Sequence, residues 1–158
     1  MKKAFKNRRL LNLYPPFLGA GIRVTRLRPD WRELDVEMKL RRWNANAVGT
    51  HYGGSLYSMA DPFYMLMLIE NLGRDYIVWD KSATIRFRRP GRGTVTASFR
   101  LTDEKLSEIR EALKTQDKID REFCVEIKDT SGELVAEVQK VIQIRRKQEP
   151  AWRTKTDP

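Results

Sequence analysis

Cysteine and histidine are almost missing from this chain of 158 residues, which holds one of each. One cysteine excludes a disulfide framework, and the pair excludes a zinc site of the usual Cys/His type, so we expect neither a metal nor a cofactor. A lone thiol fits a reducing compartment, which suggests a cytoplasmic protein. Long apolar runs are also missing: residues 56–69 contain Asp61 and are too few to cross a bilayer, so they suit a buried helix.

Positive charge is in excess, with a formal net charge of +10 at pH 7. The excess is local, because residues 1–43 carry 12 basic and 4 acidic side chains whereas residues 103–144 carry 7 and 11. A polarised basic surface suggests an anionic partner: nucleic acid, anionic lipid, or a phosphate-bearing small molecule such as coenzyme A.

Hydrophobic periodicity predicts a helix, two strands, a long apolar helix and four further strands, with a charged surface helix over residues 103–118. Residues 22–27 and 34–40 form a predicted hairpin, and residues 55–71 the long helix. Pro62 should kink that helix or remove a hydrogen bond near Ser58. We expect the last strand to be bulged near Lys140, where a charged residue interrupts the apolar pattern.

This order of elements predicts an α+β fold, in which a curved antiparallel sheet covers the long central helix. We expect three parts in the chain: an N-terminal helical extension over residues 1–18, one domain over residues 19–146, and a basic flexible tail over residues 147–158.

Asp61 is the sharpest candidate for chemistry. It is the one side chain charged at pH 7 between His51 and Glu70, and its neighbours in the sequence are apolar. A carboxylate in apolar surroundings has its charged form disfavoured unless a partner satisfies it, and such perturbed carboxylates cluster at functional sites. The structural alternative is a carboxylate that caps backbone amides or reaches solvent at the Pro62 kink.

A glycine-rich turn, residues 49–54, comes directly before the predicted helix. Its glycines let the chain run close to a ligand, and a helix N-terminus directs free N–H groups toward an oxyanion. The structural alternative is an ordinary turn with Ser55 near the helix cap. His51 with Ser55 or Ser58 also invites a hydrolase-triad interpretation, although no nucleophile-elbow pattern is present, and a hydrogen-bonded loop histidine is the simpler one.

The segment Asn46-x-x-Gly49-Thr50-x-x-Gly53-Gly54, followed by Ala60-Asp61, resembles the central motif of hotdog-fold acyl-CoA thioesterases of the PaaI-like type. Residues 85–90 resemble the strand and turn that follow in that family. The resemblance covers roughly residues 20–146 and extends to a less characterised hotdog branch of thioesterase-like proteins. It implies that residues 19–146 form a hotdog domain.

The resemblance implies a site between two subunits of a homodimer that can pair again as a tetramer. Asp61 would act as general base or nucleophile on the thioester, the Gly53 amide would hold the oxyanion, and Asn46 would orient water or the carbonyl. Gly54 and His51 belong to the same turn. The implied substrate contacts are Tyr52, Ser55, Asp80, Lys81, Arg86, Arg88, Arg89 and Arg92, with the arginines receiving the coenzyme A phosphates.

Two alternatives stay open. Tyr52 stands where the family has histidine, Pro62 follows Asp61 directly, and an Asp80-Lys81 pair could neutralise Asp61, which favours a module that binds acyl groups without hydrolysing them, or a scaffold. The net charge, with Trp31, Trp43 and Trp152 near basic residues, favours a nucleic-acid binder, although no recognised nucleic-acid motif is present.

Overall fold

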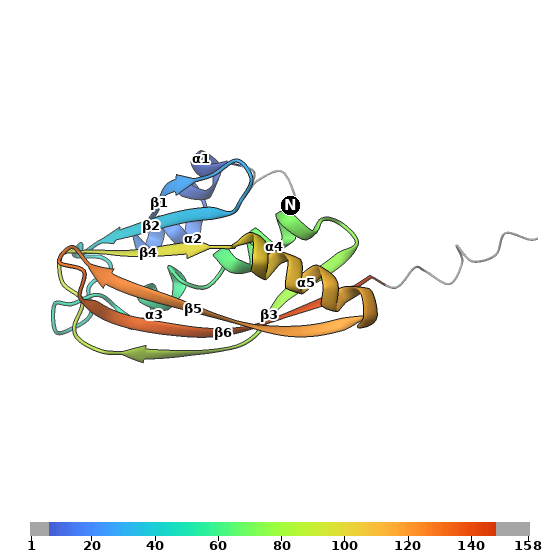
Figure 1. Ribbon diagram of the computed structural model, residues 1–158. Coiled ribbons are helices and arrows are strands. Elements are labelled where there is room, and N and C mark those ends of the chain that lie inside the picture. Colours follow the sequence, from blue (N-terminus) through green and yellow to red (C-terminus); the bar gives the residue numbers. More distant parts are fainter. Residues whose placement is uncertain (1–6, 148–158) are drawn as a thin grey trace, which may run out of the picture.

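A computed structural model of the chain describes residues 7–147 (Figure 1). Except for its first residue, the predicted basic tail over residues 147–158 lies outside this range, as do the first six residues of the predicted N-terminal extension.

Six strands form one antiparallel sheet with the order β1-β2-β4-β5-β6-β3. Its strands are β1 (Ile22–Leu27), β2 (Glu33–Lys39), β3 (Tyr76–Phe87), β4 (Thr94–Arg100), β5 (Lys118–Asp129) and β6 (Leu134–Arg146). The predicted hairpin of the first two strands is confirmed, since β1 pairs with β2 from Ile22 opposite Met38 to Leu27 opposite Leu34.

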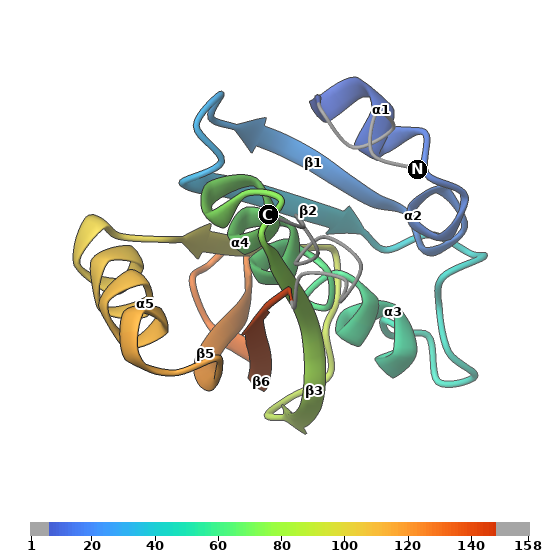
Figure 2. The same cartoon turned by 90° about the vertical axis from the view of Figure 1, so that its right-hand side faces the viewer.

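Within the described part of the chain, five helices accompany the sheet: α1 (Arg8–Asn12), α2 (Pro15–Ala20), α3 (Gly53–Ser58), α4 (Phe63–Leu72) and α5 (Asp103–Thr115). The sheet curves around α4, while α5 lies beside β5 and α1 and α2 lie next to β1 (Figure 2). The predicted class, α+β with a curved sheet around a central helical segment, is confirmed.

The central helical segment predicted over residues 55–71 is present, and it is interrupted in the middle, where the sequence predicts an effect of Pro62. α3 ends at Ser58 and α4 begins at Phe63. Pro62 lacks the N–H that would donate to the Ser58 carbonyl, which is the predicted reason for a break at this position. Asp61 therefore lies in the short connection between the two helices rather than on a helix face.

The core lies between α4 and the concave face of the sheet. Phe63 and Tyr64 of α4 stack on Phe99 of β4, with ring centroids 5.0 and 5.3 Å apart, and Tyr64 also meets Phe123 of β5 at 4.5 Å. All four rings are buried. Aromatic contacts of this kind add to the stabilisation from apolar burial and fix α4 against the sheet.

Near Lys140 the bulge lies in β3, not in the last strand as predicted; the extra residue of β6 is Val135, farther from Lys140. Asp80 is opposite Ile142 and Ser82 is opposite Val141, so Lys81 is the extra residue of β3. An extra residue reverses the alternation of faces. As a result Asp80 before the bulge and Ala83 after it share the inward face, and β6 alternates without interruption over residues 137–142, where Lys140 points inward with its buried neighbours.

β3 is an edge strand. Within residues 7–147 its one partner is β6, so the other edge of this 12-residue strand has free backbone groups. An edge of this length is a template for pairing with a second chain. None of the helices in the described range is long and apolar enough to span a membrane.

Candidate active site

Asp61 is anchored by a buried lysine. The Lys140 Nζ lies 3.1 Å from Asp61 Oδ1 and also donates to the Asp61 carbonyl oxygen. The side chain of Lys140 is 0% exposed, whereas that of Asp61 is 43% exposed. The Asp61 carboxylate is therefore near the surface, whereas the Lys140 ammonium that it contacts lies in the core.

Two further residues complete this group, which we call the Lys140 cluster: Tyr57, Asp61, Asp80 and Lys140. Tyr57, one helical turn before Asp61, donates its hydroxyl hydrogen to Asp61 Oδ1 at 2.9 Å. Asp80 Oδ1 lies 3.0 Å from Lys140 Nζ, an ion-pair contact whose angle does not suit a hydrogen bond. Asp61 Oδ2 has no hydrogen-bond partner among residues 7–147.

Burial and charge shift the proton equilibria of the cluster. Burial raises the pKa of Asp80, and the nearby Lys140 ammonium opposes that rise. Burial, with the hydrogen bond to Asp61 second, raises the pKa of Tyr57 to about 12, so its hydroxyl stays a donor at neutral pH. When both acids are ionised, two carboxylates share a single ammonium, which leaves one negative charge uncompensated within the cluster.

The glycine-rich turn is fastened by Asn46. Its Oδ1 accepts hydrogen bonds from the backbone N–H groups of Val48 and Thr50 at 3.1 and 3.0 Å, and its Nδ2 donates to the Thr50 hydroxyl at 2.9 Å. The amide predicted to orient water or a carbonyl is therefore already engaged in holding the loop.

Gly53 and Gly54 begin α3, and each lies under an aromatic ring. A Cβ at Gly53 would be 2.9 Å from the Phe87 ring, and one at Gly54 would overlap the Tyr52 ring. Neither N–H has a backbone acceptor among the described residues, as expected for the first positions of a helix. Ser55, the predicted cap residue, is buried in the first turn, while the cap position is Tyr52.

A cavity of about 440 Å³ opens beside this turn. Asn46, Thr50, His51, Gly53, Leu56, Phe87, Arg88, Arg89, Pro90 and Gly91 line it. The structure thus brings together several of the predicted site residues, but Asp61 is not part of this lining within a single chain.

His51 is a buried loop histidine. Its Nε2 lies 3.1 Å from the Gly93 carbonyl oxygen, and burial lowers its pKa, which favours the neutral ring with Nε2–H as donor. Ser58 donates to the Gly54 carbonyl at 2.8 Å. Within residues 7–147 His51 has no hydrogen bond to Ser55 or Ser58, so the hydrolase-triad interpretation has no support in the geometry.

Of the basic residues predicted to contact the substrate, all except Arg92 form ion pairs with described residues. Arg86 and Arg88 lie 3.7 and 3.6 Å from Glu137. Arg89 pairs with Asp129 and with Glu133, and Lys81 pairs with Asp120 at 2.6 Å. Arg92 has no ion pair with any described residue. Lys81 therefore turns away from Asp61, and the cation that meets Asp61 is Lys140 instead.

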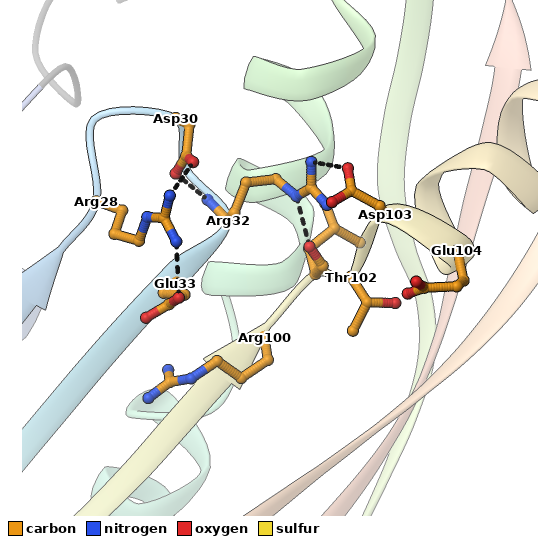
Figure 3. A pocket seen from close by; sticks show the side chains of 9 residues that line it. Arg28, Asp30, Arg32, Glu33, Arg100, Thr102, Asp103 and Glu104 are labelled. Atoms are coloured by element: carbon orange, nitrogen blue, oxygen red, sulfur yellow. Dashed lines mark hydrogen bonds and ion pairs between the residues drawn. The ribbon is translucent and has the colours of Figure 1, made fainter.

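A second cavity, of about 280 Å³, lies where the β1–β2 turn meets the start of α5 (Figure 3). Most of its charged residues pair with one another: Arg28 pairs with Asp30 and Glu33 at 2.9 Å, and Arg32 pairs with Asp103 at 2.8 Å. These contacts fasten the hairpin to α5 and leave no free charge for a ligand among the paired groups.

Sequence reasoning missed Lys140 and Tyr57. The signal for Tyr57 is its position four residues before Asp61, a spacing that would place the two side chains on one side of the helix predicted over residues 55–71. The signal for Lys140 is its place in the alternation of β6. It stands two residues from Val138 and two from Ile142, which are apolar and buried, whereas the residues between them are at least partly exposed.

A curved antiparallel sheet around a central helical segment is the hotdog fold, and solved structures confirm it. A Pseudomonas aeruginosa protein of unknown function, described as a probable thioesterase, matches with a TM-score of 0.77, 24% identity, and 89% of this chain and 93% of that chain covered. A Haemophilus influenzae thioesterase matches with a TM-score of 0.66, 14% identity and coverage of 92% and 94%. The Escherichia coli PaaI protein of the phenylacetic acid degradation operon matches with a TM-score of 0.62, 20% identity and coverage of 93% and 95%.

The chain belongs to the family described as a domain of unknown function, DUF4442, whose model matches residues 2–144. No curated protein matches the sequence.

Proposed function

We propose that this protein is a thioesterase that hydrolyses an acyl-CoA or a similar acyl thioester. The observation that carries the proposal is the set of contacts of the half-exposed Asp61 side chain. One carboxylate oxygen is held by Lys140 and Tyr57, and the other has no partner among residues 7–147. A fixed carboxylate with one free oxygen is suited to general-base or nucleophilic chemistry. The hotdog fold and the thioesterase names of its structural neighbours support the reaction class.

In the general-base form of the reaction, Asp61 Oδ2 takes a proton from water while the water oxygen attacks the thioester carbonyl carbon. The Gly53 N–H stabilises the oxyanion that forms, because it is free and lies at a helix N-terminus. Collapse of the intermediate breaks the C–S bond and releases the free acid and the thiolate. The thiolate takes up the proton that Asp61 removed from water. Asn46 contributes by holding the turn that presents this amide.

The site is proposed to be completed by a second copy of the chain. Asp61 is not in the lining of the cavity that contains Gly53, whereas β3, which carries Asp80, has a free edge along 12 residues. Pairing of two β3 edges would join the two sheets and bring Asp61 of one subunit near the turn of the other. Size-exclusion chromatography with light scattering tests this: a dimer or tetramer is expected, and a monomer at micromolar concentration contradicts it.

The acyl-CoA phosphates are proposed to meet the basic residues beside the 440 Å³ cavity, Arg88, Arg89 and Arg92, together with Arg86 of β3. Three of these guanidinium groups already share acidic partners, so they would bind phosphate by exchanging those contacts. Arg92 is free of such a partner among residues 7–147 and is the first choice for substitution.

Asp61→Asn tests the proposed reaction. The amide is isosteric but cannot accept a proton, so kcat on the best substrate of an aliphatic and aryl acyl-CoA panel should fall at least about 100-fold, measured by release of free thiol. Asp75→Asn is the matched control, since Asp75 is exposed and contributes its backbone carbonyl to a contact with Lys147. Undiminished hydrolysis by Asp61→Asn would contradict the assigned role.

A module that binds acyl groups without hydrolysing them is the second candidate. The contacts of Asp61 favour it, because its carbonyl oxygen and one carboxylate oxygen are already occupied by a fully buried ammonium. It predicts that acyl-CoAs raise the melting temperature of the protein while no thioester of the panel is turned over.

A further inference from the structure

Lys140 occupies a place where lysine is seldom found. It lies on the inward face of β6, its side chain is 0% exposed, and Val138 and Ile142 on either side of it along this face are buried. Burying an ammonium group is costly unless it is paired and hydrogen-bonded. An apolar residue at this position would continue the core, so the charge calls for an explanation beyond packing.

The contacts of Lys140 hold Asp61 at two points. Its Nζ meets both the main-chain carbonyl oxygen and Oδ1 of Asp61, which fixes the position of the residue and the rotation of its carboxylate. Asp61 lies in the break between α3 and α4, where helix hydrogen bonds do not define the backbone. Tyr57 adds a third contact to the same carboxylate oxygen. Together these contacts leave Oδ2 as the oxygen available for reaction.

Resting on the thioesterase function proposed above, we infer that Lys140 is a positioning residue that fixes the place and the orientation of the Asp61 carboxylate, with Asp80 as the second carboxylate in contact with its ammonium. Asp80 contacts the same ammonium at 3.0 Å, and its negative charge repels that of Asp61. The two neighbours therefore act on Asp61 with opposite signs. The groups that face Asp61 are Tyr57 from α3, Asp80 from β3 and Lys140 from β6.

This arrangement predicts that loss of the ammonium affects the chemical step more than substrate binding. Without Lys140 the backbone and the carboxylate of Asp61 each lose a contact, so kcat should fall while KM changes little. Asp80→Asn leaves both contacts in place, so its kcat should fall less than that of Lys140→Met. A side chain with a merely structural role would lower the amount of folded enzyme and leave kcat per folded enzyme unchanged.

The test compares Lys140→Met, Asp80→Asn and the double variant Asp80→Asn/Lys140→Met on the best acyl-CoA. The double variant removes the cation together with its more buried anion, so it keeps the fold measurable if Lys140→Met alone unfolds. Both variants without the ammonium should show kcat reduced roughly 10- to 100-fold with KM changed less than about threefold, because a misplaced reacting group affects the chemical step. Lys128→Met, which removes an exposed strand lysine paired with Glu126, is the control and should match the wild type.

A wild-type kcat in the folded double variant would overturn the inference. A kcat of Asp80→Asn reduced as much as that of Lys140→Met would also overturn it. Asp61→Asn measured in parallel distinguishes failure of the positioning role from failure of the proposed thioesterase function. If Asp61→Asn is inactive while the Lys140 variants are normal, only the positioning role of Lys140 is wrong. If Asp61→Asn is fully active, the proposed function is wrong.

Discussion

Lys140→Met should destabilise the fold at neutral pH, by an amount that the structure allows us to bound. Removing one partner from a buried ion pair costs about 3–5 kcal/mol when it leaves an uncompensated buried charge. The side chain of Asp80 is 21% exposed and that of Asp61 is 43% exposed, so water screens the charges left behind. We therefore expect about 3 kcal/mol, the lower end of that range, at pH 7.

The cost should depend on pH in a definite direction. Burial already raises the pKa of Asp80 above its ordinary value, against the pull of Lys140, and the variant removes that pull. An acid with a raised folded pKa contributes stability below its unfolded pKa of about 4, and this contribution is lost as the pH rises through the folded pKa. The gap between wild type and Lys140→Met should be small near pH 4 and largest at pH 7 and above.

Urea unfolding followed by far-UV circular dichroism between pH 4 and 8 measures this gap. Asp80→Asn/Lys140→Met should recover about 2 kcal/mol relative to Lys140→Met at pH 7, since it also removes the more buried carboxylate. Equal stability of Lys140→Met and the wild type at pH 7 would refute the reasoning. A gap that narrows as the pH rises would refute it equally, because the sign of the Asp80 contribution would then be wrong.

Most of the fold could be predicted from local patterns. Strict alternation in residues 34–40 and 94–101, and helical spacing of Leu106, Ile109 and Leu113, correspond to β2, β4 and α5. Period two and period 3.6 are properties of single elements, so they are visible without knowledge of their neighbours. The helix break also follows from one residue, because the loss of the Pro62 N–H is a local effect.

The Lys140 cluster could not be predicted in this way. Lys140 is 79 residues from Asp61, and the two meet because β6 lies under the break between α3 and α4. Asp80 faces inward because of the extra residue Lys81 in β3, and a bulge leaves no reliable local signal. Because a lysine in a strand usually faces solvent, the sequence instead favours a bulge in β6 near Lys140.

Three further predictions concern the glycine-rich turn and the connection between β3 and β4 that packs against it. Gly91→Ala should destabilise the protein by about 1–3 kcal/mol, because its Cβ would lie 3.0 Å from Val135 and 3.2 Å from His51, both buried. Gly54→Ala should cost less in thermal unfolding although its clash is closer, since the exposed Tyr52 ring can turn away; the reverse order would contradict this view of the turn. His51→Gln should flatten the pH dependence of stability in urea unfolding below about pH 6.5. Burial lowers the pKa of His51, so the unfolded chain binds its proton first and the wild type loses this contribution as the pH falls from about 6.5 through the folded pKa. An unchanged difference between the variant and the wild type from pH 7 to pH 5 would show that the ring is not held neutral by the loop.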